Sequence, residues 1–225
     1  MYRLRVRFKR GEEIKFISHL DLIRLWQRAL HRARLPLAYS KGFSPHPQIS
    51  MAMPLAIGVT SEAELADIFL ATPVSPHFFN AALSQQLPPG IEILQVHPIS
   101  PQQPSLQSQT SFAEYAVTIA TDKETNEIEA NITRLLSAEH LPWQHQRDTG
   151  TRSYDLRILI SNLWLIDRSP TCCTIGMKLR CDSNGSGRPE QVSLALGFSE
   201  QPRSIHRTRL ILKTACQNGD PYEGE

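Results

Sequence analysis

The first residues of the chain alternate strictly between apolar and basic side chains. The apolar positions are Tyr2, Leu4, Val6 and Phe8, and the basic positions are Arg3, Arg5, Arg7 and Lys9. Successive side chains of a β-strand point to opposite faces of a sheet, so a period of two predicts a strand. We expect residues 2–9 to form a half-buried strand with a cationic face turned to solvent.

Between residues 20 and 35 the apolar spacing becomes that of an amphipathic helix. The apolar stripe consists of Leu22, Leu25, Trp26, Ala29, Leu30 and Ala33. Ser18 or His19 lies at the expected start of the helix, and Asp21 is a first-turn acid that favours the helix dipole. Pro36 marks the end, because proline cannot continue a helix.

The segments that follow have an order that indicates a domain type. They are a strand that begins at residue 48 and ends at Pro54 or just beyond it, strands at 63–71 and 91–99, and a helix between the proline-containing stretches 73–76 and 88–90. Together with the first strand and helix they give the order β-α-β-β-α-β. This is the order of a ferredoxin-like, or split βαβ, domain.

Residues 99–111 are uncharged and rich in proline, glutamine and serine, which predicts a linker. The same order of elements then recurs without any repeat of sequence. Its segments are strands at 112–120, 153–167, 172–181 and 205–213, and helices at 123–139 and 189–197. The predicted fold class is therefore α+β, with two tandem ferredoxin-like (split βαβ) domains on antiparallel sheets. The predicted boundaries are an N-terminal domain at 1–98, a C-terminal domain at 112–213 and a flexible tail at 214–225.

Composition narrows the class of protein. Apolar residues make up 40% and charged residues 20% of the 225 residues, which is typical of a globular protein. No apolar run approaches the roughly 20 residues of a membrane-spanning helix, and the N-terminal segment lacks a signal-peptide core. The four cysteines are Cys172, Cys173, Cys181 and Cys216. They are too few and too clustered for a secreted disulfide scaffold, so we expect a cytoplasmic protein with reduced thiols.

The net charge of +2 conceals a polarity along the chain. Residues 1–47 contain eleven basic and three acidic residues, a net charge of +8, so the remainder carries −6. Within the predicted helix, Arg24, Arg28 and Arg32 recur at intervals of four on one face. Such a row is typical of a surface that faces a polyanion, but a solvated face or a docking face for an acidic partner has the same pattern.

The loop after this helix reads AYSKGFSPHPQIS and has the most unusual composition in the chain. Glycine permits backbone conformations that other residues avoid, and the flanking prolines stiffen the segment. Its candidate binding residues are Tyr39, Ser40, Lys41, Gly42, Phe43 and His46. Aromatic rings, hydroxyls and a cation suit contact with RNA. The alternative is a plain connection in which Phe43 fills the core and His46 is simply exposed.

His19 and His46 raise a catalytic hypothesis. Histidine titrates near neutral pH, so the pair, or one of them with Lys41, has the chemistry for metal-independent RNA cleavage. No second sequence element fixes that geometry. We expect no metal and no cofactor, because the cysteines lack a paired C-x-x-C spacing and no phosphate-binding loop or dinucleotide fingerprint occurs.

In the second half, charged residues interrupt strands that are otherwise apolar. They are Asp155, Arg157, His206 and Arg207. Two interpretations stay open: these residues pair across the sheet, or they extend a binding face.

The segment from Phe16 to Ile68 resembles the core signature of a radical SAM-associated bacterial family of unknown function. The matching positions are Phe16, Ser18, His19, Asp21, Tyr39, Ser40, Gly42, Phe43, Pro45, His46, Pro47, Pro54, Leu55 and Gly58. Ser44 stands where asparagine is common in the family. Members are fused behind a radical SAM enzyme or encoded beside one. Because this chain lacks the fused catalytic domain, the resemblance implies an accessory protein that works with a separate radical SAM protein.

These observations predict an RNA-binding accessory module that acts with a radical SAM protein in tRNA or rRNA modification or maturation, and that is not an enzyme by itself. The candidate contact residues are Arg24, Arg28, Arg32, Tyr39, Ser40, Lys41, Gly42, Phe43 and His46. One alternative is a metal-independent endoribonuclease that uses His19 and His46. The other is a protein-interaction module that docks the radical SAM partner through its basic face and never binds RNA.

Overall fold

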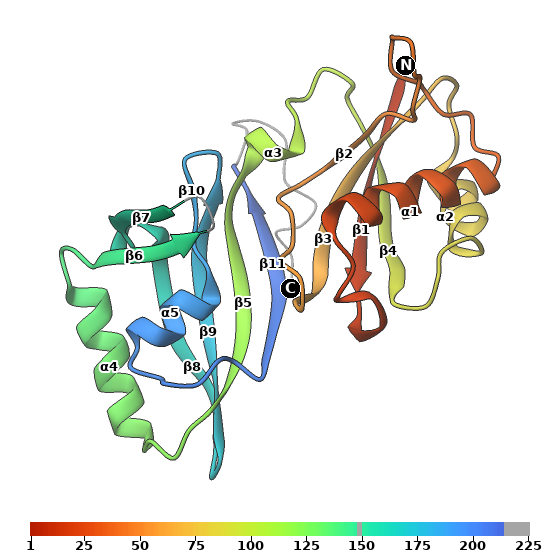
Figure 1. Cartoon of the computed structure of the whole chain (residues 1–225). Helices are drawn as coiled ribbons and strands as arrows, with labels where there is room; N and C mark the ends of the chain where they lie inside the picture. Colours follow the sequence, from red (N-terminus) through yellow and green to blue (C-terminus); the bar gives the residue numbers. More distant parts are fainter. Residues whose placement is uncertain (148–149, 214–225) are drawn as a thin grey trace.

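The computed structural model of the chain describes residues 1–147 and 150–213, so the tail predicted at 214–225 lies outside the described residues. Figure 1 shows two halves side by side, each with helices packed on strands, and one sheet that runs through both. Within the described ranges, no helix is long and apolar enough to cross a membrane.

The N-terminal half follows the predicted order of elements. It contains β1 (Tyr2–Arg10), η1 (Glu12–Ile14), α1 (His19–Arg32), β2 (Ile49–Met51), β3 (Thr60–Leu70), α2 (Pro76–Ser84) and β4 (Ile91–Ile99). Strand β2 is shorter than predicted, since it ends at Met51 and the predicted end is at Pro54 or just beyond it. The chain leaves the strand early because Leu55 and Val59 pack into the hydrophobic core of the other half.

The C-terminal half contains a hairpin, a short helix within the predicted linker 99–111 and a two-residue strand that the sequence did not predict. Its elements are α3 (Leu106–Gln109), β5 (Thr110–Ala120), α4 (Thr125–Ser137), β6 (Pro142–Arg147), β7 (Gly150–Asp155), η2 (Arg157–Leu159), β8 (Ile160–Ser169), β9 (Cys172–Asp182), β10 (Gly185–Ser186), α5 (Pro189–Ala195) and β11 (Ser204–Leu212). The hairpin of β6 and β7 escaped prediction because its sequence, PWQHQR in β6, has no alternating apolar residues.

Among the described residues, nine strands form one sheet. Its main path is β10-β9-β5-β11-β3-β1-β4, while β2 pairs with β3 and β8 pairs with β9. The predicted α+β class with mainly antiparallel strands is confirmed, but the expectation of two separate sheets is wrong. Strand β11 runs parallel to β3 and pairs at His206–Thr60 and Arg207–Ser61. This pairing joins two sheet edges that would otherwise expose unpaired backbone groups.

Each half has the same internal strand order. In the N-terminal half the order is β4-β1-β3-β2, and in the C-terminal half it is β11-β5-β9-β8. All neighbours within a half are antiparallel. Numbered within these four-strand sets, the first strand (β1 or β5) lies between the fourth (β4 or β11) and the third (β3 or β9) in both halves.

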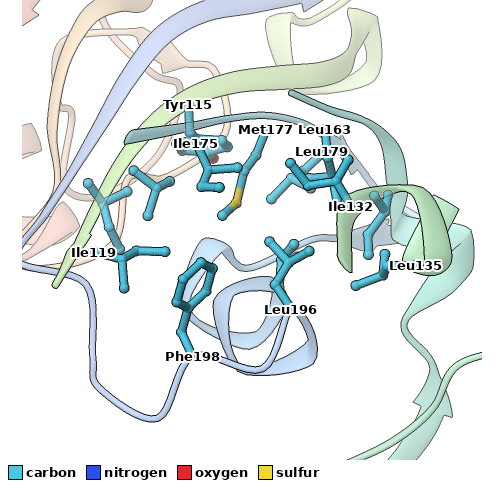
Figure 2. Packing of buried hydrophobic residues seen from close by; sticks show 14 of the residues in the cluster. Tyr115, Ile119, Ile132, Leu135, Leu163, Ile175, Met177, Leu179, Leu196 and Phe198 are labelled. Carbon is cyan, nitrogen blue, oxygen red and sulfur yellow. The ribbon is translucent and has the colours of Figure 1, made fainter. Parts of the chain in front are cut away.

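Two hydrophobic cores support the two halves. In the N-terminal core, Trp26 of α1 packs on Phe8 of β1 with ring centroids 4.8 Å apart. In the C-terminal core, Figure 2 shows Leu196 and Phe198, which follow α5, facing the sheet residues Ile119 and Met177. The period of two in β1 and the helical pattern of α1 predicted the buried positions of Phe8 and Trp26 correctly.

The predicted cationic face of β1 is wrong for Arg3 and Arg5, which are 4% and 5% exposed. Both bind the buried carboxylate of Asp67 on β3: Arg3 Nη2 donates to Oδ2 at 2.5 Å, and Arg5 Nε donates to Oδ1 at 2.9 Å. The connection after β4 covers this face, because Arg3 Nη1 donates to the Gln103 carbonyl at 2.6 Å. Alternation along one strand does not reveal that a distant segment covers its polar side.

Candidate functional site

Helix α1 begins where the sequence predicts, and Ser18 is its N-cap. The Asp21 amide donates to Ser18 Oγ at 3.1 Å, and Ser18 Oγ donates to the Asp21 carboxylate at 2.7 Å. This hydroxyl donor, more than the neighbouring Arg24, lowers the pKa of Asp21 below its usual range. Ser18 and Asp21 therefore fix the helix start, and their side chains are engaged in hydrogen bonds within the protein.

The arginine row of α1 is exposed but is not uniform. Arg24 forms a solvent-exposed ion pair with Asp21 at 3.2 Å, which contributes little to stability. Arg32 Nη2 donates to the Gln86 carbonyl just after α2, at 2.8 Å. At 3.6 residues per turn, Arg24 lies about 60° around the helix from Gln27, and Arg32 lies about 140° from it. The three arginines thus lie at increasing angles around the helix from Gln27: Arg24 is nearest to it, Arg28 is in the middle and Arg32 lies towards α2.

We call the segment from Tyr39 to Pro47 the signature loop. Tyr39 and Pro47 form an antiparallel bridge, and the Ser40 amide donates to the His46 carbonyl at 2.9 Å. The five residues between Ser40 and His46 are all exposed. Gly42 has a φ of 150°, a value that favours glycine. The two ends of the signature loop are therefore paired through their backbones, and its tip is exposed.

Phe43 at this tip is fully exposed to solvent, with a relative accessibility of 110%, and Tyr39 at the base is 46% exposed. The interpretation in which Phe43 fills the core is wrong. The loop is too short to fold back, because its two ends already pair with each other. Two aromatic rings are thus available to a binding partner on one loop.

His46 is held by its own loop. Its Nδ1 lies 3.1 Å from Ser40 Oγ and 3.2 Å from the Ser44 carbonyl oxygen. A carbonyl only accepts hydrogen bonds, so Nδ1 carries the proton in the neutral ring and Nε2 is left as an acceptor. The loop therefore fixes both the orientation and the tautomer of this histidine.

Beside the signature loop lies a groove of about 600 Å³. Helix α1 forms one wall and the chain from 46 to 49 forms the other. We call it the loop groove, and its lining residues are Ile23, Gln27, Ser40, His46, Pro47, Gln48, Ile49 and Phe69. The composition of the loop marks Ser40 and His46 as candidates, but neither glutamine and neither isoleucine could be selected from the sequence. No local pattern marks them, since only the packing of the loop against α1 brings them together.

His19 lies in a different environment from His46. Burial lowers the pKa of His19 below its usual range; the carboxylate of Glu64 opposes this effect, and the Arg10 guanidinium adds to it. Buried Arg10 also donates to the Ile17 carbonyl at 2.7 Å, which anchors the turn before α1. In the described part of the chain no contact joins His19 to His46, so their predicted acid–base partnership stays a prediction.

The two halves share a buried ion pair at their junction. Arg207 of β11 donates to Glu64 of β3 at 3.0 Å, and the two side chains are 2% and 7% exposed. Arg207 also donates to the Tyr115 hydroxyl at 3.3 Å and to the Pro54 carbonyl at 3.3 Å. Arg207 therefore has a structural role across the sheet, and its buried side chain is not accessible to a binding partner.

The other charged residues that interrupt the C-terminal strands also have partners within the protein. His206 Nδ1 lies 2.7 Å from Thr60 Oγ1, and His140 Nδ1 lies 2.9 Å from the Asp155 carboxylate. Arg157 donates to three backbone carbonyls at 2.7 to 3.1 Å. His206 and Arg207 thus pair across the sheet, from β11 to β3, whereas Asp155 and Arg157 pair with nearby groups of the C-terminal half and not across the sheet.

Three cysteines fall within the described residues, and all are free thiols. Cys173 and Cys181 are buried in the C-terminal core, and burial raises the pKa of both thiols. Cys172 is partly buried, with its sulfur 3.0 Å from Ser169 Oγ. Buried neutral thiols of this kind act as small apolar side chains.

The sequence model of a family described as "Uncharacterized protein conserved in bacteria (DUF2344)" matches residues 3–189. Since this match covers most of the chain, the protein belongs to that family. No curated protein matches the sequence.

Solved structures resemble the chain in fold. A chain from the crystal structure of a Cbf5-Nop10-Gar1 complex has a TM-score of 0.50 and 8% identity, and the match covers 92% of this chain and 48% of that one. A chain of the archaeal box H/ACA sRNP Nop10-Cbf5 complex gives 0.47 at 12% identity, covering 93% and 48%. A chain of an H/ACA RNP bound to a substrate RNA containing 2'-deoxyuridine gives 0.47 at 9%, covering 92% and 47%. The chain spans about half the length of these relatives, and at such identities the likeness is one of fold alone.

Proposed function

We propose that this member of the DUF2344 family is an RNA-binding module that holds an unpaired stretch of RNA between α1 and the signature loop. Arg24, Arg28 and Lys41 bind phosphates, and Tyr39 and Phe43 stack on bases. Arg32 is already bonded to the Gln86 carbonyl and contributes at the far end of the row. RNA whose bases are splayed out is recognised in this way, by stacking combined with phosphate contacts.

The full exposure of Phe43 is the observation that carries this proposal. Burial of a phenylalanine side chain is worth about 1.5–3 kcal/mol, so a partner that covers this ring gains that free energy. Stacking of one base on an aromatic ring is worth about 1–3 kcal/mol. The ring is presented on a paired loop beside exposed arginines, and this combination favours an aromatic, anionic ligand over an apolar protein surface.

Two further parts of the proposal have narrower support. The partnership with a radical SAM protein, and with it a role in tRNA or rRNA modification or maturation, follows from the family resemblance of the signature positions. The fold likeness to the Cbf5-Nop10-Gar1 structure supports the architecture and adds nothing about a ligand. The RNA-binding proposal therefore depends on the surface of α1 and the signature loop.

We also propose that each half is a split βαβ unit, so that the chain is a tandem pair with boundaries near residues 98 and 112. The equal strand orders of the two halves support this assignment. On this view, the parallel pairing of β11 with β3 and the Arg207–Glu64 ion pair fix the two units as one body.

The direct test is fluorescence-anisotropy binding of a single-stranded RNA at several salt concentrations. Each phosphate contact contributes a salt slope of roughly 0.7 for single strands, so Arg24→Glu/Arg28→Glu should lower the slope by about 1.4 and weaken binding. The matched control is Arg134→Glu/Arg203→Glu, which changes the net charge equally at exposed positions of the C-terminal half. Phe43→Ala should weaken binding with no change in slope, because it removes stacking and leaves the charges in place.

Absence of RNA binding by the unaltered protein, or equal losses in the control variant, would refute the proposal. The RNA recovered from the assay is examined on a gel as well. Intact RNA agrees with a binding module, whereas cut products that disappear in His46→Ala would identify the endoribonuclease instead.

A further inference from the structure

The loop groove is not needed for phosphate binding or for stacking on Phe43, yet it lies beside the groups that do both. Its volume of about 600 Å³ falls within the range of small-molecule sites, which is about 300–1,000 Å³. The apolar side chains Ile23 and Ile49 line it from α1 and β2. Polar groups join them from Gln27, Gln48 and His46. The groove is thus an apolar slot with a few polar groups in fixed places.

The polar groups of the groove are free to bind a ligand. In the described part of the chain, the side-chain amides of Gln27 and Gln48 bond to no other protein group. Each carboxamide presents a donor beside an acceptor, and His46 adds an acceptor at Nε2, since its Nδ1 is occupied by Ser40 and Ser44. The backbone of Gln48 is held by its amide, which donates to the Ala38 carbonyl at 2.9 Å. Both amide and imidazole are therefore presented from anchored segments.

We infer that the loop groove holds one unpaired nucleobase of a bound RNA and reads its edge through Gln27 and Gln48. This inference rests on the proposed RNA-binding function. A base has a flat apolar face for Ile23 and Ile49, and an edge of alternating donors and acceptors that a carboxamide pairs with.

The charges around the groove fit the same occupant. Arg24 lies about 60° around α1 from Gln27, and Lys41 belongs to the loop on the other side. Both are exposed cations, so the phosphates that flank an inserted base meet positive charge on either side of the groove. The backbone of a peptide also pairs with amides, but an apolar peptide segment brings no negative charge to Arg24 and Lys41, whereas a nucleotide brings both an edge and a phosphate. The observations therefore favour a nucleotide.

The test compares four oligomers of about 12 nucleotides, a length within the usual site size of single-strand binding: oligo(A), oligo(C), oligo(U) and an abasic RNA of the same length. We expect the unaltered protein to bind one of the three base-containing oligomers about tenfold more tightly than the other two, because stacking on Phe43 accepts every base whereas the amides read only one kind of edge. In Gln27→Leu/Gln48→Leu, this preference should fall about tenfold while the affinity for abasic RNA stays unchanged. The matched control is Gln85→Leu/Gln95→Leu, which alters two exposed glutamines outside the groove and should keep the preference.

A third variant, Ile49→Trp, fills the groove and leaves its amides in place; it should remove the preference as well. Circular dichroism and the urea midpoint of each variant show whether it folds. Equal binding of oligo(A), oligo(C) and oligo(U) by the unaltered protein, or a preserved preference in both groove variants, would overturn the inference while the RNA-binding proposal stands. Failure to bind any of the four oligomers refutes the RNA-binding proposal itself and leaves the groove to a peptide of a partner protein.

Discussion

Replacement of Asp67 by asparagine tests the account of the buried face of β1 most directly. Asp67 is fully buried and is the shared acceptor of Arg3 and Arg5, which are themselves almost fully buried. The asparagine side chain would keep the shape of the aspartate and lose its charge. The other acceptors around the two guanidiniums are the carbonyls of Gln103 and Pro104 and the side-chain amide of Gln109, all of them neutral. Two buried cations would then lack a counter-charge.

The expected cost follows from the burial. Removing one partner of a buried ion pair costs about 3–5 kcal/mol, and solvent screening is small because the side chains of Arg3, Arg5 and Asp67 are 3%, 6% and 0% exposed. Arg5→Met should cost less, about 1.5–3 kcal/mol, because Arg3 and Asp67 remain as a neutral pair. The two substitutions thus remove the same Arg5–Asp67 contact, yet they differ in the charge left behind.

Urea unfolding followed by tryptophan fluorescence measures both costs, since Trp26 is fully buried in the N-terminal core. The comparison requires that the free energy of unfolding falls with urea concentration at the same slope in each variant. The reasoning is refuted if Asp67→Asn costs less than about 1 kcal/mol, or if Arg5→Met costs as much as Asp67→Asn. Binding of RNA at low urea should survive Arg5→Met, because Arg5 is buried beneath the connection after β4 and takes no part in the loop groove.

Two further predictions concern other parts of the molecule. A Cβ at Gly176 would collide with the Trp164 ring on the neighbouring strand, so Gly176→Ala should lower the free energy of unfolding in urea by about 1–3 kcal/mol. The double variant Gly176→Ala/Trp164→Leu should recover part of this loss. A Gly176→Ala variant as stable as the unaltered protein would contradict the close packing. Burial beside Arg10 lowers the pKa of His19, against the pull of Glu64, so the unfolded chain binds the proton more tightly. Stability from neutral His19 is then complete above about pH 6.5 and is lost as the pH falls below that value. His19→Gln should lose less stability than the unaltered protein between about pH 7.5 and about pH 5, and an equal loss in both contradicts the assignment.

The signature loop can be selected from the sequence, but only part of the candidate site can. The composition of the loop and the spacing of the arginines were sufficient to select Tyr39, Phe43, His46 and Arg24. Gln27 and Gln48 could not be selected, because a polar residue on a helix face and another before a strand are ordinary in any surface. They become a pair only where the loop folds back beside α1, and that contact is a property of the tertiary structure.

The charged residues of the sheet show the same division. A period of two in β1 determined that Arg3 and Arg5 share a face, since side-chain direction alternates along any strand. Whether that face meets water depended on the connection after β4, which returns across it from a hundred residues away. Likewise, the alternating pattern of β11 predicted a strand, but not that Arg207 would find Glu64 across a parallel junction.

Local spacing thus determined most of the elements, their order and the apolar side of β1 and α1, because those depend only on the geometry of a helix or a strand. The joining of two sheets through β11 and β3, the covering of the arginine face and the closing of the groove were decided by tertiary structure. Each of these places residues far apart in the sequence in contact, and such contacts depend on burial and charge pairing over the whole molecule, which no local pattern contains.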